Sequence, residues 1–81
     1  MAGDFKRVLC IIKRIRPLLA GNPAQVQGAV LADLLAMWLA GHVSLKSREA
    51  TEANREELLA MHIETVRQLV PENAKAMRLP W

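Results

Sequence analysis

The chain has 81 residues, a net charge of +3 and a single cysteine, and 52% of its residues are hydrophobic. This composition excludes a disordered chain, and the length predicts a single domain over residues 1–81. Cys10 alone excludes an internal disulfide, and two histidines with one distant cysteine lack the spacing of a zinc site. Because so small a core seldom supplies more than about 3–5 kcal/mol, we expect association to stabilise the chain.

The first expected element is a helix over residues 4–20. Phe5, Val8 and Ile12 recur at the three- and four-residue spacing that places side chains on one helix face. Pro17 interrupts this pattern, so we expect the helix to end or kink near that residue. The excess of basic residues on the other side favours an acidic partner, a nucleic acid or an anionic membrane surface. The candidates for such contacts are Lys6, Arg7, Lys13, Arg14 and Arg16.

The second expected helix covers residues 23–41, with Asn22 as its cap and Gly41 as a left-handed end. It is apolar on nearly every side and carries one formal charge, Asp33. A helix that is apolar all round must be buried on all sides, which a chain of this length can hardly do alone. We therefore expect a homo-oligomer or a complex with another protein. The interface candidates are Ala29, Ala32, Ala36, Trp38 and Ala40 on this helix, and Trp81 at the end of the chain.

The third expected helix covers residues 47–70, with a regular apolar stripe in its second half and His62 near the middle of the stripe. Pro71 is expected to stop this helix or to open a short final turn before the tail. No segment shows the alternation typical of a strand. The fold class predicted from these patterns is all-α, a small domain of three helices that assembles as a helical oligomer.

Two polar residues lie among apolar neighbours and are candidates for burial, Asp33 and His62. An isolated buried carboxylate needs a partner, and Arg14, Arg16, Arg55 or His62 could supply one. The alternative is that Asp33 is a ligand-binding or catalytic acid. His62 is interpreted as a packed residue whose polar edge is satisfied by a neighbour, with a general base or a metal ligand as the alternative.

Neither apolar stretch of the chain has the features of a membrane span or of a signal peptide. Val26–Val43 is shorter than the roughly 20 apolar residues of a span, and Asp33 would cost about 2.5–3.5 kcal/mol near the bilayer centre. Val8–Ile12 is too short for a signal peptide and is followed at once by basic residues. The lone thiol fits a reducing compartment. We therefore expect a cytoplasmic protein with no inserted segment.

The functional expectation is a small intracellular interaction protein, such as an adaptor, a regulatory subunit or a structural subunit, that associates through its apolar central helix. The alternative is a nucleic-acid-associated protein that uses the basic side of the first helix. No phosphate-binding loop, metal motif or nucleophile with a neighbouring base is visible, so we expect no enzyme activity, no cofactor and no metal.

Overall fold

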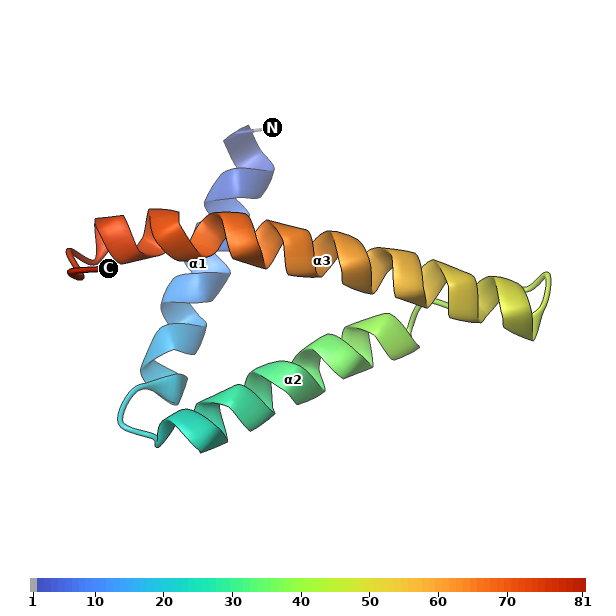
Figure 1. Ribbon diagram of the computed structural model, residues 1–81, viewed down its shortest axis with the longest axis horizontal. Coiled ribbons are helices and arrows are strands. Elements are labelled where there is room, and N and C mark those ends of the chain that lie inside the picture. The colour runs from blue at the N-terminus through green and yellow to red at the C-terminus, as the bar shows by residue number, and fades with distance from the viewer. Residues whose placement is uncertain (1) are drawn as a thin grey trace. The chain divides into compact units, whose positions relative to one another are not determined.

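The structure is a computed structural model that describes residues 2–81, and these residues form three α-helices and no strand (Figure 1). The helices are α1 (Ala2–Leu19), α2 (Ala24–Ala40) and α3 (Arg48–Ala76). The predicted all-α class with three helices is confirmed. Backbone contacts divide the chain into two compact units, Met1–Leu34 and Leu35–Trp81, so each unit is described by itself. The prediction that residues 1–81 form a single domain stays a prediction.

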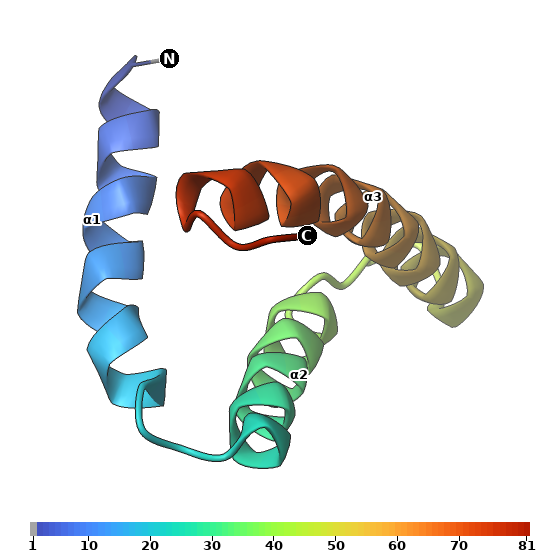
Figure 2. The same cartoon turned by 60° about the vertical axis from the view of Figure 1, so that its left-hand side comes forward.

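In the first unit, α1 continues through Pro17 and ends two residues later, as one unbroken ribbon (Figure 2). A proline here removes a single backbone donor close to the helix end, where few intrahelical bonds remain to be lost. Gly21 follows with φ +82°, a left-handed conformation that glycine adopts without strain. The Asn22 amide donates to the carbonyls of Leu18 (3.0 Å) and Leu19 (3.3 Å). Asn22, predicted as the cap of the second helix, therefore serves the end of α1.

The start and the end of α2 are set by local hydrogen bonds. Gln27 donates from its backbone N–H to the Pro23 carbonyl (3.0 Å) and from its side chain to the Asn22 carbonyl (2.8 Å). At the other end, the Gly41 N–H donates to the Met37 carbonyl at 3.1 Å. Gly41 is not left-handed, since the positive-φ glycine of the described residues is Gly21. The prediction of a left-handed end at Gly41 is wrong, because other groups satisfy the last carbonyls of α2.

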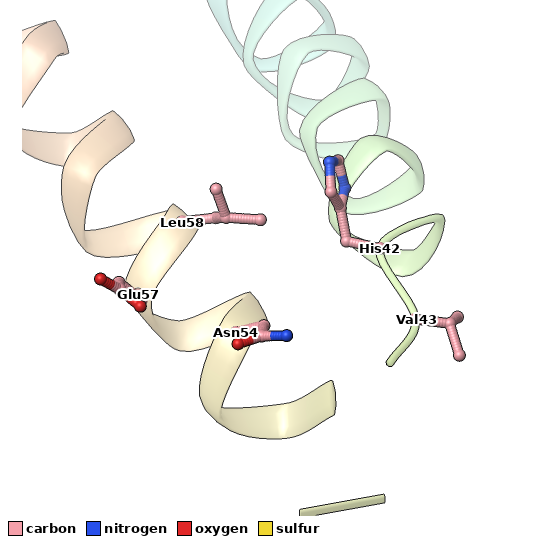
Figure 3. A pocket seen from close by; sticks show the side chains of 5 residues that line it. All are labelled: His42, Val43, Asn54, Glu57 and Leu58. Atoms are coloured by element: carbon pink, nitrogen blue, oxygen red, sulfur yellow. The ribbon is translucent and has the colours of Figure 1, made fainter. Parts of the chain in front are cut away.

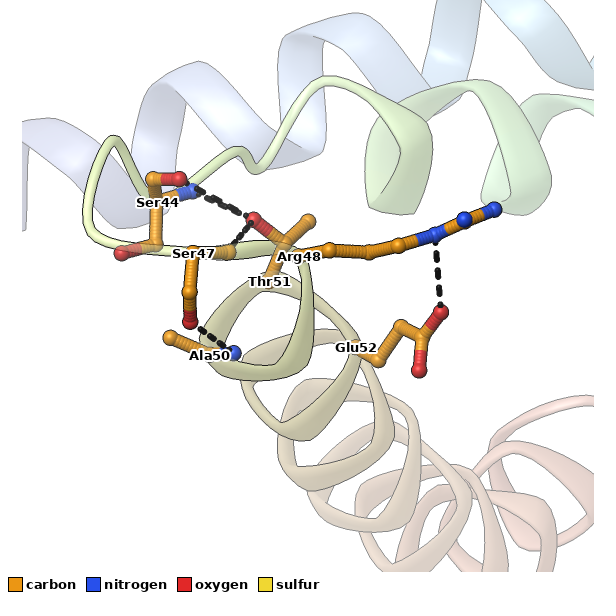
Figure 4. A network of polar contacts seen from close by, with 6 residues as sticks. All are labelled: Ser44, Ser47, Arg48, Ala50, Thr51 and Glu52. Carbon is orange, nitrogen blue, oxygen red and sulfur yellow. Dashed lines mark hydrogen bonds and ion pairs between the residues drawn. The ribbon is translucent and has the colours of Figure 1, made fainter.

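In the second unit, the link to α3 is closed by Ser47 and Thr51 (Figure 4). Ser47 has extended backbone angles, and its hydroxyl accepts from the Ala50 N–H at 3.0 Å, the usual geometry of a helix N-cap. Thr51 Oγ1 accepts from the Ser44 N–H (2.9 Å), and its proton faces the carbonyls of Ser44 (3.2 Å) and Ser47 (3.0 Å). This network fixes the first turn of α3 to the preceding link.

The last turns of α3 extend beyond the predicted end, because the helix passes through Pro71 and ends at Ala76. The predicted stop at residue 70 is therefore wrong, and the alternative, further helical turns that begin at Pro71, agrees with the structure. The helix closes with two bonds that satisfy its final carbonyls: Leu79 N–H to Ala74 O (2.9 Å) and Arg78 N–H to Lys75 O (3.0 Å). This pattern is a Schellman motif, and Arg78 occupies its left-handed position with φ +58°.

The described residues contain no buried hydrophobic side chain. Thr51, at 7% exposure, is the one residue among them that is buried, and its hydroxyl is fully engaged. The described helices include no membrane-spanning candidate, since none combines the length and hydropathy that such a segment requires. Secondary structure is thus formed and capped, while the apolar faces of the helices are still open to solvent.

Candidate interaction surface

The apolar face of α1 in the first unit is open to solvent. Phe5, Val8, Ile12 and Leu18 lie on one half of the helix at 100° per residue, and all four are exposed. The basic side chains predicted for an anionic partner are also exposed, and four of them share the opposite half. Arg16 is the exception, since its position lies beside the apolar face. Helix α1 is therefore an amphipathic helix with a cationic back and an uncovered apolar front.

Helix α2 exposes large apolar side chains along most of its length. Leu31 is 52% exposed and Leu34 is 48% exposed, and Val30 and Met37 are exposed beside them. Ala29, Ala32, Ala36 and Ala40, the interface candidates of small size, form the other side and are exposed as well. Both sides of α2 thus have the character predicted for contact faces, and both are uncovered in the single chain.

Arg55 joins α3 to the end of α2 within the second unit. Its Nε donates to the Leu39 carbonyl (3.1 Å), and its Nη2 donates to the Ala40 carbonyl (2.6 Å). These carbonyls belong to the last turn of α2, where the helix dipole favours positive charge. Arg55 was predicted only as a possible partner of Asp33. Its role at the helix end depends on the contact between α2 and α3, which the sequence pattern does not predict.

Trp38 lies between two imidazoles at the same corner. Its ring contacts His42 edge-on, with centroids 4.7 Å apart, and His62 in a tilted arrangement at 4.8 Å. The His42 Nδ1–H donates to the Trp38 carbonyl at 2.7 Å, which orients this imidazole at the end of α2. The structure therefore brings together two residues that the sequence analysis singled out separately, Trp38 and His62. Their contact packs α2 against α3 and leaves both side chains exposed to solvent.

A shallow cavity of about 260 Å³ opens beside this corner (Figure 3). Asn54 and Leu58 of α3 face His42 across it, while Glu57 and Val43 point away from the gap. Among residues 2–81, no three His, Cys, Asp or Glu side chains converge as a metal-binding group. The cavity has a mixed lining of one imidazole, one amide and one leucine side chain directed into it, which does not define a reaction or a ligand class.

The second half of α3 carries an apolar stripe that nothing in the second unit covers. Recorded contacts between α2 and α3 include the bonds of Arg55 and the ring contact of His62, which lies at the middle of α3. Beyond them, the α3 stripe continues on the same side of the helix, and every member is exposed. The α3 stripe consists of Ile63, Val66, Leu69 and Val70. Its spacing was visible in the sequence, but its residues were not among the predicted interface candidates.

The remaining predicted residues lie on the surface of the single chain. Asp33 and His62, both predicted as candidates for burial, are exposed in the structure. Among the described residues, the recorded ion pair joins Arg48 to Glu52 at 3.5 Å and does not include Asp33. Trp81 is 97% exposed at the end of the chain.

Comparisons of the chain with protein-family models, with curated proteins and with solved structures found no match.

Proposed function

We propose that this protein is a small interaction subunit, an adaptor or a regulatory or structural component, that associates with another protein chain through the apolar surface centred on α2. The supporting observation is the absence of any buried hydrophobic side chain among the described residues. Full burial of one large aliphatic side chain stabilises a protein by about 1.5–3 kcal/mol. Exposed apolar side chains within each unit therefore support association with a partner that covers them.

The polar groups at the ends of α2 and α3 are bonded within the chain, so the exposed apolar side chains are the groups that a partner would cover. Both ends of α3 are closed by hydrogen bonds, and Arg55 satisfies the end of α2. No buried side-chain nitrogen or oxygen of the described residues lacks a hydrogen-bond partner. We also propose an intracellular location, where the exposed thiol of Cys10 stays reduced.

Hydrogen exchange along α2 tests this proposal. A helix with open faces exchanges its amides quickly, and burial of the same helix in an interface slows that exchange. We expect amides of Val26–Ala40 to become more protected as the protein concentration rises or a protein partner is added. Strong protection of these amides in a monomer, unchanged by concentration, would show that the chain covers α2 by itself and that association is not its purpose.

A second candidate function, binding to nucleic acid, is favoured by one observation on α1. Lys6, Arg7, Lys13 and Arg14 share one side of the helix, and all four are exposed. Helix α1 carries five basic residues and one acidic residue. Such a cationic side can neutralise phosphates without any base-specific contact. The apolar faces described above would stay uncovered in such a complex, so this function ranks behind association with protein.

Titration with duplex DNA and with RNA at several salt concentrations tests this second candidate. Phosphate contacts release counterions, so the affinity must fall steeply as salt rises. Replacing Lys6, Lys13 and Arg14, three members of this cationic side, by glutamine should then strongly weaken binding while the helical circular dichroism is kept. The matched control replaces Arg48, Arg67 and Arg78 outside α1 and should bind as the unaltered chain does. Absence of binding at low salt would remove this candidate.

A further inference from the structure

We propose that α1 binds the surface of a membrane rich in anionic phospholipids and lies along it with its apolar front against the acyl chains. The proposal goes beyond the proposed function, because it assigns a lipid partner to α1 while α2 associates with protein. It rests on residues of α1 alone, all of which belong to the first unit.

The apolar front of α1 supplies the part of the contact that enters the lipid. Phe5 is 65% exposed, and Val8 and Ile12 are exposed on the same side. Interfacial helices bury such side chains about 5–10 Å deep, at the boundary between headgroups and acyl chains. Two charged residues on this side, Asp4 and Arg16, lie in the first and last turns, where the helix dipole favours their charges. The front is therefore uninterrupted between them.

Basic side chains lie along both borders of this front. Lys13 is four residues after Leu9, and Arg7 is four residues before Ile11, so each is about 40° around the helix from an apolar residue at its border. A residue seven positions away continues each row, and all four side chains are exposed. The rows are Lys6 with Lys13 and Arg7 with Arg14. Basic side chains at such borders extend to the depth of the headgroup phosphates while the front stays in the acyl chains.

The middle of the back, between the two basic rows, carries no charge. It is formed by Gly3, Cys10 and Pro17. A nucleic acid bound at the back would leave the apolar front in water. An anionic bilayer surface engages the front and both basic rows in one orientation. With five basic residues and one acidic residue, α1 is complementary in charge to such a surface.

Cosedimentation of the full chain with lipid vesicles tests the proposal. We expect binding to vesicles of phosphatidylcholine with about 30 mol% phosphatidylserine, and at least about tenfold weaker binding to phosphatidylcholine alone. Each basic residue near an anionic surface contributes about fivefold in affinity. The double variant Arg7→Gln with Lys13→Gln removes one cation from each border, so it should weaken binding to the anionic vesicles at least about tenfold.

The matched control is Arg67→Gln with Lys75→Gln, the same change of charge at exposed positions of α3. It should bind the anionic vesicles as the unaltered chain does. Equal weakening by the control and the double variant would overturn the proposal, because net charge and not α1 would then determine binding. The comparison of the two vesicle types uses the unaltered chain, so it decides the proposal even if a variant fails to fold.

A fluorescent label on the thiol reports how the helix lies. Cys10 is the one cysteine of the chain and is exposed in the middle of the back. A polarity-sensitive fluorophore on Cys10 should stay in water when anionic vesicles are added. With the thiol moved to the front, in Cys10→Ser with Ile12→Cys, the same fluorophore should shift its emission to the blue. Equal responses at the two positions would contradict a helix that turns its front to the lipid.

The remaining outcomes separate lipid from other partners. Absence of binding to anionic vesicles, or equal binding to phosphatidylcholine alone, would overturn the proposal. Binding to duplex DNA without binding to vesicles would make α1 a nucleic-acid surface instead. The protection of α2 amides is measured without lipid, so a failure of the lipid proposal leaves the proposed function standing, and the reverse also holds.

Discussion

At the scale of single residues, Arg55 is the side chain that most clearly ties sequence to tertiary structure. It is half-buried, and its planar fork bonds two carbonyls of the last turn of α2 at once. Lysine offers one point charge and cannot reproduce this fork. We predict that Arg55→Lys lowers the free energy of unfolding by about 1–3 kcal/mol, measured by urea denaturation. Arg67→Lys, at an exposed site on the same helix, should leave it unchanged. Equal unfolding midpoints for the two variants would contradict this role.

At Arg78, we predict a substitution that raises the free energy of unfolding. Its left-handed backbone, at φ +58°, places a Cβ where only glycine is free of steric cost, within the motif that ends α3. We predict that Arg78→Gly raises the free energy of unfolding by about 1 kcal/mol. Arg78→Ala removes the same charge but keeps the Cβ, so it should give no such gain. If the alanine variant were stabilised as much as the glycine variant, charge and not backbone strain would be the cause.

Asp33 is the residue whose role depends most on the assembly. It is exposed on α2 in the single chain, among side chains that are otherwise apolar. We predict that the partner chain supplies an ion pair or hydrogen bonds to this carboxylate. Asp33→Ala should then destabilise the assembly by about 3–5 kcal/mol if it strands a fully buried charge, and Asp33→Asn should cost less. The measurement is the concentration-dependent Tm of each variant. Thermal melts that neither substitution changes, together with a lost ligand-binding signal, would make Asp33 a functional acid instead.

At the scale of elements, the two sides of α2 differ in size and predict different mutational effects. The small side allows close approach of another helix, so a larger residue there forces the helices apart at a cost of about 1–3 kcal/mol. We predict that Ala36→Leu weakens association, measured by light scattering during dilution. The control Ala53→Leu places the same extra volume on the exposed polar side of α3 and should have no effect. Unchanged association in Ala36→Leu would remove this side of α2 from the interface.

The sequence predicted the helices well and their ends less well, for a physical reason. Apolar periodicity is a property of many residues, so one exception does not hide it, and all three helices were found. An end depends on one or two hydrogen bonds. The Asn22 side chain bonds to the end of α1 and does not cap α2. At the end of α2, Arg55 bonds a carbonyl where a left-handed Gly41 was expected. Pro71 lies inside α3 and does not end it. Each outcome depends on neighbours that the local pattern does not reveal.

The candidate surface was predictable in part for the same reason. The all-round apolar character of α2 predicts a contact element, and the structure shows its large apolar residues exposed. The contact of Trp38 with His62 and the bond from Arg55 to Ala40 join residues far apart in sequence. Such long-range contacts follow from the angle between helices, which composition does not determine. The α3 stripe was visible as a pattern, but only its exposure indicates that it lacks a cover.

At the scale of the whole molecule, charge and apolar surface affect association differently as the salt concentration changes. The net charge of +3 on each chain gives two copies a mutual repulsion, which salt screens. Apolar burial favours their association at any ionic strength. Self-association should therefore hold or strengthen as salt rises, whereas binding of α1 to phosphates should weaken. The sign of the salt effect separates the two functions even when both partners are present.

The most direct measurement of the central claim follows mass and helix content in the same sample as the protein is diluted. We predict that the mass falls from that of an assembly to the 9.0 kDa of the single chain over the same concentration range in which the helical circular dichroism signal decreases. Folding and association would then be one event, because the single chain buries no hydrophobic side chain among its described residues. A monomer that keeps its full helical signal and unfolds cooperatively at the lowest concentration would contradict the account.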